Sequence, residues 1–253
     1  MTQTPSFPLL EHPAFSGVSE ASITRLEAAC RVLRFELGGQ LSDSNNIAAR
    51  ILVILQGQAR LVGRHHGRLT TVGKYGPGSV IGAASLLCGT PCENVIAAEE
   101  VLACAISDEL WRELYASEAS FRQWCDQQLW PQELLKLLEA LEQTTPEADS
   151  SALEQLEDAL QSAERCSPDQ ASVDAALVAG KRLYVTSAWG DLMFGQSVCT
   201  AMDLPACEPF SLRLVSLPAS EFSNQAGKTP GNGSGSLVSA SSIQDAEVLP
   251  PVS

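Results

Sequence analysis

The sequence predicts an α+β fold for residues 7–143, centred on a β-roll or barrel with flanking helices. Three observations predict this fold. Short apolar segments with the period of strands fill residues 31–106, and glycine-rich turns separate them. A short helical pattern precedes these segments, and a longer one follows them.

The first helix is expected directly after Ser19, which is a residue type favoured at helix N-caps. Glu20 places a negative charge in the first turn, where the helix dipole favours it. Ile23 and Leu26 then share one face, so this helix is expected to pack its apolar side against the β-roll.

Strands are expected at six places, which are residues 32–37, 51–55, 59–62, 69–72, 94–98 and 101–106. Paired glycines or a Gln-Gly step end the early strands, and Tyr75-Gly76-Pro77-Gly78 forms a tight turn. The apolar segment from Ile81 to Leu87 is expected to make one helical turn after Gly82.

A longer helical pattern begins after Ser107 and runs on through Trp124. Pro131 is expected to break or kink it before a second leucine-rich stretch. The aromatic side chains of this region are interpreted as core or dimer-face residues in preference to a lid over a ligand; they are Trp111, Phe121, Trp124 and Trp130.

Acidic residues dominate the middle of the chain. The 253 residues include 30 acidic and 16 basic side chains, a net charge of -14, which disfavours nucleic acid as a direct partner. Eleven of the acids lie between residues 133 and 174, against only Lys136 and Arg165. Leu153, Leu156 and Leu160 mark an amphipathic helix there, so a solvated face is a better interpretation than a calcium or other ligand site.

Four segments follow from these patterns: the domain at residues 7–143, an acidic helical connector at 144–180, a small β module at 181–218, and a Gly/Ser/Pro-rich linker or tail at 219–253. Within the β module, strands are expected at 183–187, 192–194 and 210–217, and its core is expected to be thin.

Eight scattered cysteines are interpreted as reduced residues of a cytoplasmic protein, since a chain of this length needs no disulfide framework. No stretch approaches the roughly 20 apolar residues that cross a bilayer, so direct membrane insertion is not expected.

No catalytic residue, metal site or cofactor is predicted. Gly227-Lys228-Thr229 lacks the earlier glycine of a phosphate-binding loop. His65 and His66 could be combined with Cys88 and Cys92 as zinc ligands, but adjacent histidines beside a glycine fit a hairpin tip better. His12, near the amino terminus, is the remaining histidine, so a Cys-His or Ser-His pair has almost no candidates.

Four stretches in this order resemble the cyclic-nucleotide-binding domain of the catabolite activator protein and of protein kinase A regulatory subunits; they are residues 12–19, 51–61, 76–82 and 98–111. The resemblance covers about half of the chain. It implies that the β-roll is a double-stranded β-helix, or jelly roll. Transcription factors of that type continue into a basic helix-turn-helix, whereas residues 144–217 are acidic.

In that family a short helix presents backbone N–H groups to the cyclic phosphate, a glutamate binds the ribose, and an arginine pairs with the phosphate. The resemblance carries the candidate ligand-binding positions onto Gly82, Ala83, Ala84, Ser85, Glu93 and Asn94. The glutamate position is Ala83, and no basic residue occurs between Lys74 and Arg112. A phosphate that faces Glu93 loses a charge-assisted pair worth roughly 1.5–3 kcal/mol and meets a like charge.

The remainder of the chain, with Tyr184-Val185-Thr186-Ser187 and residues 209–215, is similar to the amino-terminal region of bacterial peptidase-containing ABC peptide exporters. This similarity implies a cytoplasmic sensor or substrate-docking module, held at the inner face of the membrane through a transporter.

The sequence therefore predicts a non-catalytic regulatory or substrate-docking module with a degenerate cyclic-nucleotide cassette, whose partners are transporter domains or another protein. The alternative is a working sensor of a cyclic nucleotide or of another small ligand. For a sensor of altered specificity, an uncharged or cationic ligand replaces the cyclic phosphate near Glu93 and Asn94.

Overall fold

The computed structural model describes residues 8–65, 68–144, 152–189, 192–200, 204 and 208–219. All of these residues belong to one compact unit. The tail expected from residue 219 lies outside the described residues from residue 220 onward, and so does the tip of the hairpin at residues 66 and 67.

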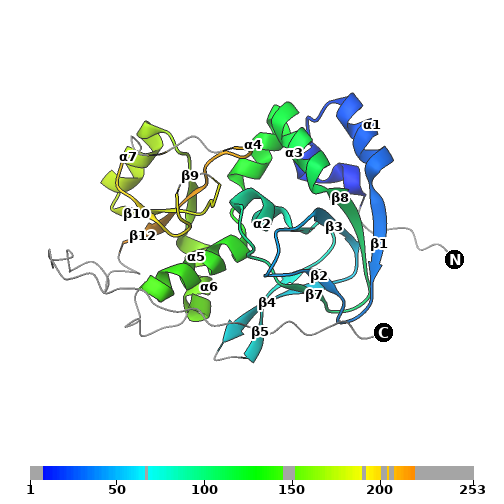
Figure 1. Ribbon diagram of the computed structural model, residues 1–253, viewed down its shortest axis with the longest axis horizontal. Helices are drawn as coiled ribbons and strands as arrows, with labels where there is room; N and C mark the ends of the chain where they lie inside the picture. The colour runs from blue at the N-terminus through cyan, green and yellow to red at the C-terminus, as the bar shows by residue number, and fades with distance from the viewer. Residues whose placement is uncertain are drawn as a thin grey trace, which may run out of the picture. The chain divides into compact units, whose positions relative to one another are not determined.

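Two four-stranded antiparallel sheets form the β-roll (Figure 1). In spatial order the first contains β1 (Arg31–Phe35), β8 (Val101–Ser107), β3 (Arg50–Gln56) and β6 (Val80–Ile81). The second contains β2 (Gln40–Ser42), β7 (Val95–Ala97), β4 (Ala59–His65) and β5 (Arg68–Tyr75). The α+β class and the β-roll are thereby confirmed. Within the β-roll the sequence pattern missed β2 and β6, which have three and two residues.

Strand β3 shows why its sequence is apolar without alternation. Ile51, Val53 and Leu55 pack with the helices in one core cluster, whereas Leu52 and Ile54 belong to a second cluster among strands of both sheets. Successive side chains of a strand point to opposite faces, and both faces of β3 are covered. Every position from residue 51 to 55 is therefore buried.

Helices precede and follow the strands of the β-roll along the chain. Two 3-10 turns, η1 (Leu9–Glu11) and η2 (Pro13–Phe15), lead into α1 (Glu20–Ala29), and α2 (Ala83–Cys88) follows β6. After β8 come α3 (Asp108–Ser117), α4 (Ala119–Gln127) and α5 (Pro131–Thr144). The expected caps at Ser19 and Ser107 are confirmed, because each hydroxyl accepts the N–H three residues later.

The helix expected to run from Ser107 through Trp124 is two helices, and this part of the prediction is wrong. Glu118 has extended backbone angles and separates α3 from α4. Its carboxylate accepts hydrogen bonds from Ser19 and Ser22 at the start of α1, including two hydroxyl contacts of 2.6 Å. That long-range contact holds the break, and the periodicity of the helix sequence does not reveal it.

Beyond α5 the chain forms α6 (Ala152–Ser162), α7 (Gln170–Val178) and a third antiparallel sheet. The spatial order of its strands is β11 (Ser197–Val198), β10 (Lys181–Val185), β12 (Leu214–Pro218) and β9 (Glu164–Cys166). The segment expected as a helical connector thus supplies β9, which pairs with β12. The boundaries proposed for the connector and the β module stay predictions.

Two strand positions in this sheet differ from expectation. Residues 192–194 are not a strand, because Gly195 turns the chain with a φ of 84° and donates its N–H to the Val185 carbonyl. The strand at Ser197 follows instead. The last strand starts at Leu214, not at residue 210, because the preceding residues are held by side-chain contacts to α3, α4 and α5.

The aromatic side chains of α3 and α4 belong to the core, as predicted. Trp111 and Phe121 are fully buried, with ring centroids 4.8 Å apart. His12 is also part of the packed structure: its ring is buried, accepts the N–H of Ala14 and lies 3.0 Å from the Gly78 carbonyl oxygen. Burial also lowers the pKa of His12.

Candidate functional site

The segment from Gly82 to Asn94, here called the cassette, begins at a position that only glycine fits. Gly82 has a φ of 96°, and an added Cβ would lie 2.8 Å from the Arg50 carbonyl oxygen. Helix α2 starts at the next residue and is buried along its whole length. The β-roll therefore holds the first N–H groups of α2 in a fixed place.

Glu93 occupies those N–H groups. Its side chain is fully buried, and its carboxylate accepts the N–H of Gly82 at 2.6 Å and the N–H of Ser85 at 3.2 Å. The Ser85 hydroxyl in turn donates to the Gly82 carbonyl at 3.0 Å. Orphan N–H groups at the start of a helix bind anions, and here the anion is a side chain of the same chain.

Burial dominates the electrostatics of Glu93. It raises the pKa of the carboxyl group above the ordinary value of 4.5, while the hydrogen bonds from Gly82 and Ser85 act in the opposite direction. The N–H groups thus offset only part of the cost of removing the charge from water.

This shift gives a prediction for pH. Because the pKa of Glu93 is higher in the folded protein, that state binds more protons than the unfolded state at pH values between 4.5 and the raised pKa. The contribution of Glu93 to stability therefore falls as the pH rises through this interval.

Thermal melts of the wild type and of Glu93→Gln, recorded from pH 5 to pH 8, test this expectation. Relative to the variant, which has no carboxyl group to titrate, the wild type should gain stability as the pH falls. A difference that stays constant over the range would contradict the raised pKa.

The six candidate positions fall into two groups. Gly82, Ala83, Ala84 and Ser85 form the start of α2, and Glu93 is brought against them. Asn94 lies apart, in contact with Gln40 at 3.5 Å, and it lines a different cavity of about 230 Å³. Sequence reasoning placed Glu93 opposite a ligand phosphate, whereas the structure places its carboxylate against the N–H groups of Gly82 and Ser85.

That small cavity lies between the cassette, β4 and helix α5. Its lining includes Cys92 from the cassette, Gly63 from β4, and Lys136 and Glu139 from α5. Lys136 therefore brings a cation to this cavity from outside the stretch between Lys74 and Arg112, which contains no basic residue. An acidic side chain, Glu139, adjoins this cation. Burial raises the pKa of Glu139, and the charge of Lys136 offsets only part of that rise.

The C-terminal end of α2 is covered by Ala188 and Trp189, which follow β10 of the third sheet. The N–H of Ala188 donates to the Cys88 carbonyl at 2.7 Å, and the Trp189 indole N–H donates to the Leu86 carbonyl at 3.1 Å. Gly89 leaves room for the indole, since a Cβ there would lie 2.8 Å from the Trp189 ring. Both ends of α2 are therefore satisfied from within the chain.

A buried ion-pair network joins α5 to the third sheet. Arg213, just before β12, donates to the Glu133 carboxylate at 2.7 Å and 3.0 Å, and Thr186 donates to it at 2.5 Å. A guanidinium nitrogen of Arg165 lies 3.9 Å from a carboxylate oxygen of Glu133. Burial alone would raise the pKa of Glu133, but the charges of Arg213 and Arg165 outweigh it and hold the pKa below its ordinary value.

Sequence reasoning did not identify this network. The available signal was a lone arginine between Leu212 and Leu214, in a segment whose neighbours are all buried, together with an acid at the start of a leucine-rich helix. The pattern shows that Arg213 needs a buried partner, but it does not name Glu133.

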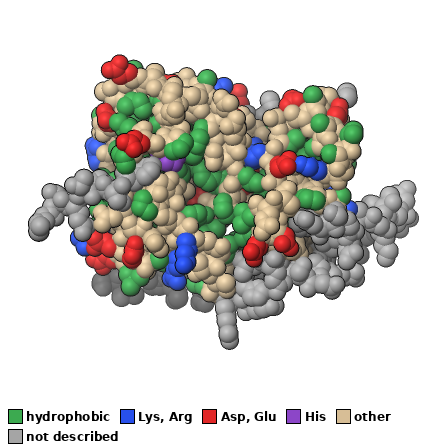
Figure 2. All heavy atoms as spheres, turned by 180° about the vertical axis from the view of Figure 1, so that it is seen from behind, with side chains coloured by type: hydrophobic (Ala, Val, Ile, Leu, Met, Phe, Trp, Pro, Cys, Tyr) green, Lys and Arg blue, Asp and Glu red, His purple; other side chains and the backbone are tan. Residues whose placement is uncertain are grey.

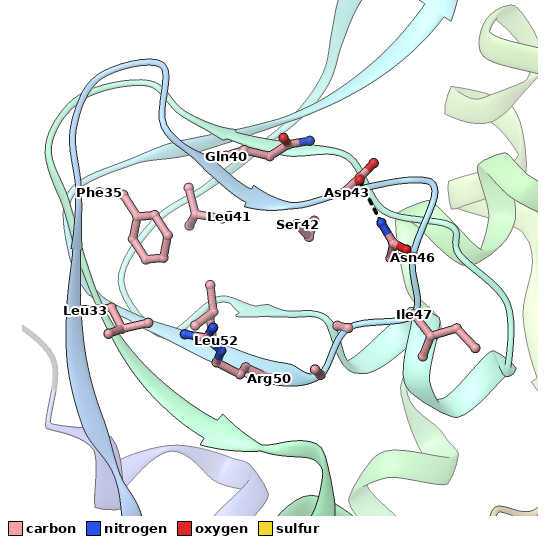
Figure 3. A pocket seen from close by; sticks show the side chains of 12 residues that line it. Leu33, Phe35, Gln40, Leu41, Ser42, Asp43, Asn46, Ile47, Arg50 and Leu52 are labelled. Carbon is pink, nitrogen blue, oxygen red and sulfur yellow. Dashed lines mark hydrogen bonds between the residues drawn. The ribbon is translucent and has the colours of Figure 1, made fainter. Parts of the chain in front are cut away.

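A further cavity of about 440 Å³ opens between β1, β2 and the start of β3 (Figure 3). Leu33, Phe35, Leu41 and Leu52 point toward one another from its walls. The cassette is not part of its lining. This cavity is therefore separate from the place where Glu93 binds.

Within the described residues, no group of three or more side chains could hold a metal ion. The described cysteines are all unpaired thiols. No described helix combines the length and the apolar character needed to cross a membrane.

Comparison with known proteins finds one family whose model resembles the β-roll. Residues 32–118 match the family model of the cyclic nucleotide-binding domain. Among curated proteins no match is found.

Similar solved structures include a regulatory subunit of a cAMP-independent protein kinase A from Trypanosoma brucei, with 21% identity and a TM-score of 0.42, covering 47% of this chain and 45% of that one. A cAMP-binding acyltransferase from Mycobacterium smegmatis has 20% identity and a TM-score of 0.38, over 54% of this chain and 40% of that one. The N-terminal domain of a transcriptional regulator from Streptomyces coelicolor has 18% identity and a TM-score of 0.40, over 56% of this chain and 99% of that one.

This chain therefore covers less than half of the kinase subunit and of the acyltransferase. The family match and the observed β-roll agree in the part of the chain that they describe. Residues 32–118 are therefore similar to the cyclic nucleotide-binding domain, and they include most of the strands of the observed β-roll.

Proposed function

We propose that this chain is a non-catalytic regulatory module whose cyclic-phosphate site is closed by its own Glu93, and that it acts through contact with a protein partner. The observation that carries the proposal is the pair of hydrogen bonds from the N–H groups of Gly82 and Ser85 to the buried Glu93 carboxylate. Domains of this family are generally regulatory, which supports the non-catalytic part of the proposal.

A cyclic phosphate has to displace a carboxylate to reach the cassette. The Glu93 carboxylate would then stay buried beside the phosphate. Two neighbouring negative charges repel each other strongly where there is little water to screen them. No lysine or arginine of the cassette offsets this repulsion, because residues 75–111 contain none. The closed state is therefore favoured without any ligand.

Helix α5 supports the same conclusion. It lies along one wall of the cavity beside the cassette, and the buried pair of Glu133 with Arg213 fixes its first turn to the third sheet. In a ligand-operated domain this helix would have to respond to binding. Here the contacts that hold it come from the chain itself.

A thermal-shift measurement on the full chain tests the proposal. Cyclic AMP and cyclic GMP at millimolar concentration are expected to leave the melting temperature unchanged within about 1 °C. A ligand at 100 times its dissociation constant stabilises by about 2.7 kcal/mol, which is a shift of several degrees for a protein of this size. A shift of that size from binding at the cassette would overturn the proposal.

The nature of the partner follows from the sequence resemblance to peptide exporters, so transporter domains or an exported peptide stay the predicted partner class, at the inner face of the membrane. On the face seen in Figure 2, basic side chains lie singly among acidic and hydrophobic ones. Such a mixed surface suits a protein partner better than a phosphate backbone.

A second candidate function is a sensor of a different small ligand. The cavity of about 440 Å³ favours it, because apolar side chains from three strands form its walls (Figure 3). The Ser42 hydroxyl beside them is buried and has no hydrogen-bond partner in the described chain. A small apolar molecule with one acceptor group would satisfy that hydroxyl.

A further inference from the structure

A cavity of about 630 Å³ lies between α4, the end of β9 with the residues that follow it, and the segment that leads into β12. It lies apart from the cassette, and no residue of the cassette lines it. Its polar lining comes from three segments: Arg122, Gln123 and Asp126 of α4, Arg165 and Ser167 in and after β9, and Ser211 before β12.

Arg165 is a cation in the wall of this cavity, and only 11% of its side chain is exposed. It donates to the backbone carbonyls of Asp126 at 3.1 Å and Leu214 at 2.6 Å, which are neutral acceptors. The closest carboxylate, that of Glu133, already pairs with Arg213. Burial, and then the charge of Arg213, lower the pKa of Arg165 to about 10, so its charge is only partly compensated.

Arg122 supplies a second guanidinium from the α4 side. It donates to the carbonyls of Tyr115 at 3.0 Å and Ala116 at 2.7 Å, and its guanidinium carbon lies 5.8 Å from the Tyr115 ring centroid. These contacts hold the side chain in place without a counter-charge.

The acids near the cavity are already engaged. Asp126, whose carboxylate is the only one among the described lining residues, accepts the hydroxyls of Tyr115 at 2.7 Å and Ser211 at 3.1 Å. Asp169, close to the rim, caps α7 through Ser172. The described lining of the cavity therefore includes two arginines and one carboxylate that is already hydrogen-bonded, in a chain whose net charge is -14.

We infer that this cavity binds a small anion that carries a phosphate or carboxylate group, held between Arg122 and Arg165. A guanidinium fork is suited to two oxygen atoms of such a group, and the hydroxyl of Ser167 can act as a further polar contact. The bound anion links α4 of the β-roll domain to the third sheet. This inference does not depend on the proposed function, because the cassette takes no part in it.

The test is a thermal-shift titration of the full chain with inorganic phosphate and, separately, with malonate, against sodium chloride at matched ionic strength. Saturable stabilisation by several degrees is expected for one or both anions, and the better one identifies the group that the site prefers. Equal shifts with sodium chloride would overturn the inference, because they would show screening only.

Two matched variants assign the site. Gln123→Glu adds a carboxylate to the cavity at an exposed position. It should lower the affinity for the anion at least tenfold without unfolding the protein. Gln58→Glu makes the same change at an exposed turn between β3 and β4 and should leave the affinity unchanged. Equal affinity in both variants would contradict the inferred site.

Cyclic AMP is itself an anion, and these variants separate its two possible sites. Stabilisation by cyclic AMP that disappears in Gln123→Glu belongs to this cavity. Stabilisation that survives in that variant belongs elsewhere and bears on the cassette, so failure of this inference and failure of the proposed function give different results.

Discussion

Replacing Arg213 with methionine is expected to lower the free energy of unfolding by about 3–5 kcal/mol, the usual cost of breaking a buried ion pair from one side. The variant leaves Glu133 fully buried, with Thr186 and the more distant Arg165 as its remaining partners. For a protein of this size the loss corresponds to a fall in melting temperature of roughly 6–20 °C. Urea or thermal unfolding measures it.

The matched control is Arg34→Met. Arg34 pairs with Glu100 on the surface, where both side chains are about half exposed, and such pairs contribute roughly 0–1 kcal/mol. If Arg213→Met cost no more than this control, the ion pair would not hold α5 to the third sheet, and one support of the proposed function would be lost.

Replacing Glu93 with alanine is expected to cost about 1–3 kcal/mol, because the buried N–H groups of Gly82 and Ser85 lose their acceptor. The same change leaves a space lined by N–H donors at the start of α2, which an added anion can fill. Inorganic phosphate should therefore restore part of the lost stability.

Two further variants serve as controls for Glu93→Ala. Glu99→Ala removes an exposed acid six residues further along and should change the stability by less than about 0.5 kcal/mol. Combining Glu93→Ala with Gln123→Glu removes any contribution of phosphate bound beside Arg122. A Glu93→Ala protein as stable as the wild type would show that the carboxylate is not needed to close the cassette.

The sequence was sufficient to predict the β-roll because its elements are determined locally. The alternating or continuous apolar runs of β3 and β8, and the serine caps of α1 and α3, are visible over a few residues. The break at Glu118 and the pairing of β9 with β12 depend on contacts between distant parts of the chain. Such long-range contacts cannot be predicted from a local sequence pattern.

The candidate site divides in the same way. The lack of a basic residue between Lys74 and Arg112 indicated a cassette without its usual phosphate partner. The direction in which Glu93 points could not be predicted, because it depends on the fold of the whole segment from Gly82 to Asn94. The sequence therefore predicted a degenerate cassette, whereas the structure shows an internal acceptor for its N–H groups.

The most direct test of that acceptor is the amide NMR signal of Gly82 in the full chain, followed during a titration with cyclic AMP. The wild-type signal is predicted to stay in place, because the Glu93 carboxylate already accepts this N–H, whereas in Glu93→Ala the signal should be displaced and should move again when phosphate is added. Movement of the wild-type Gly82 signal with cyclic AMP, to a position unaffected by Gln123→Glu, would contradict the closed cassette and show that the cassette binds cyclic AMP.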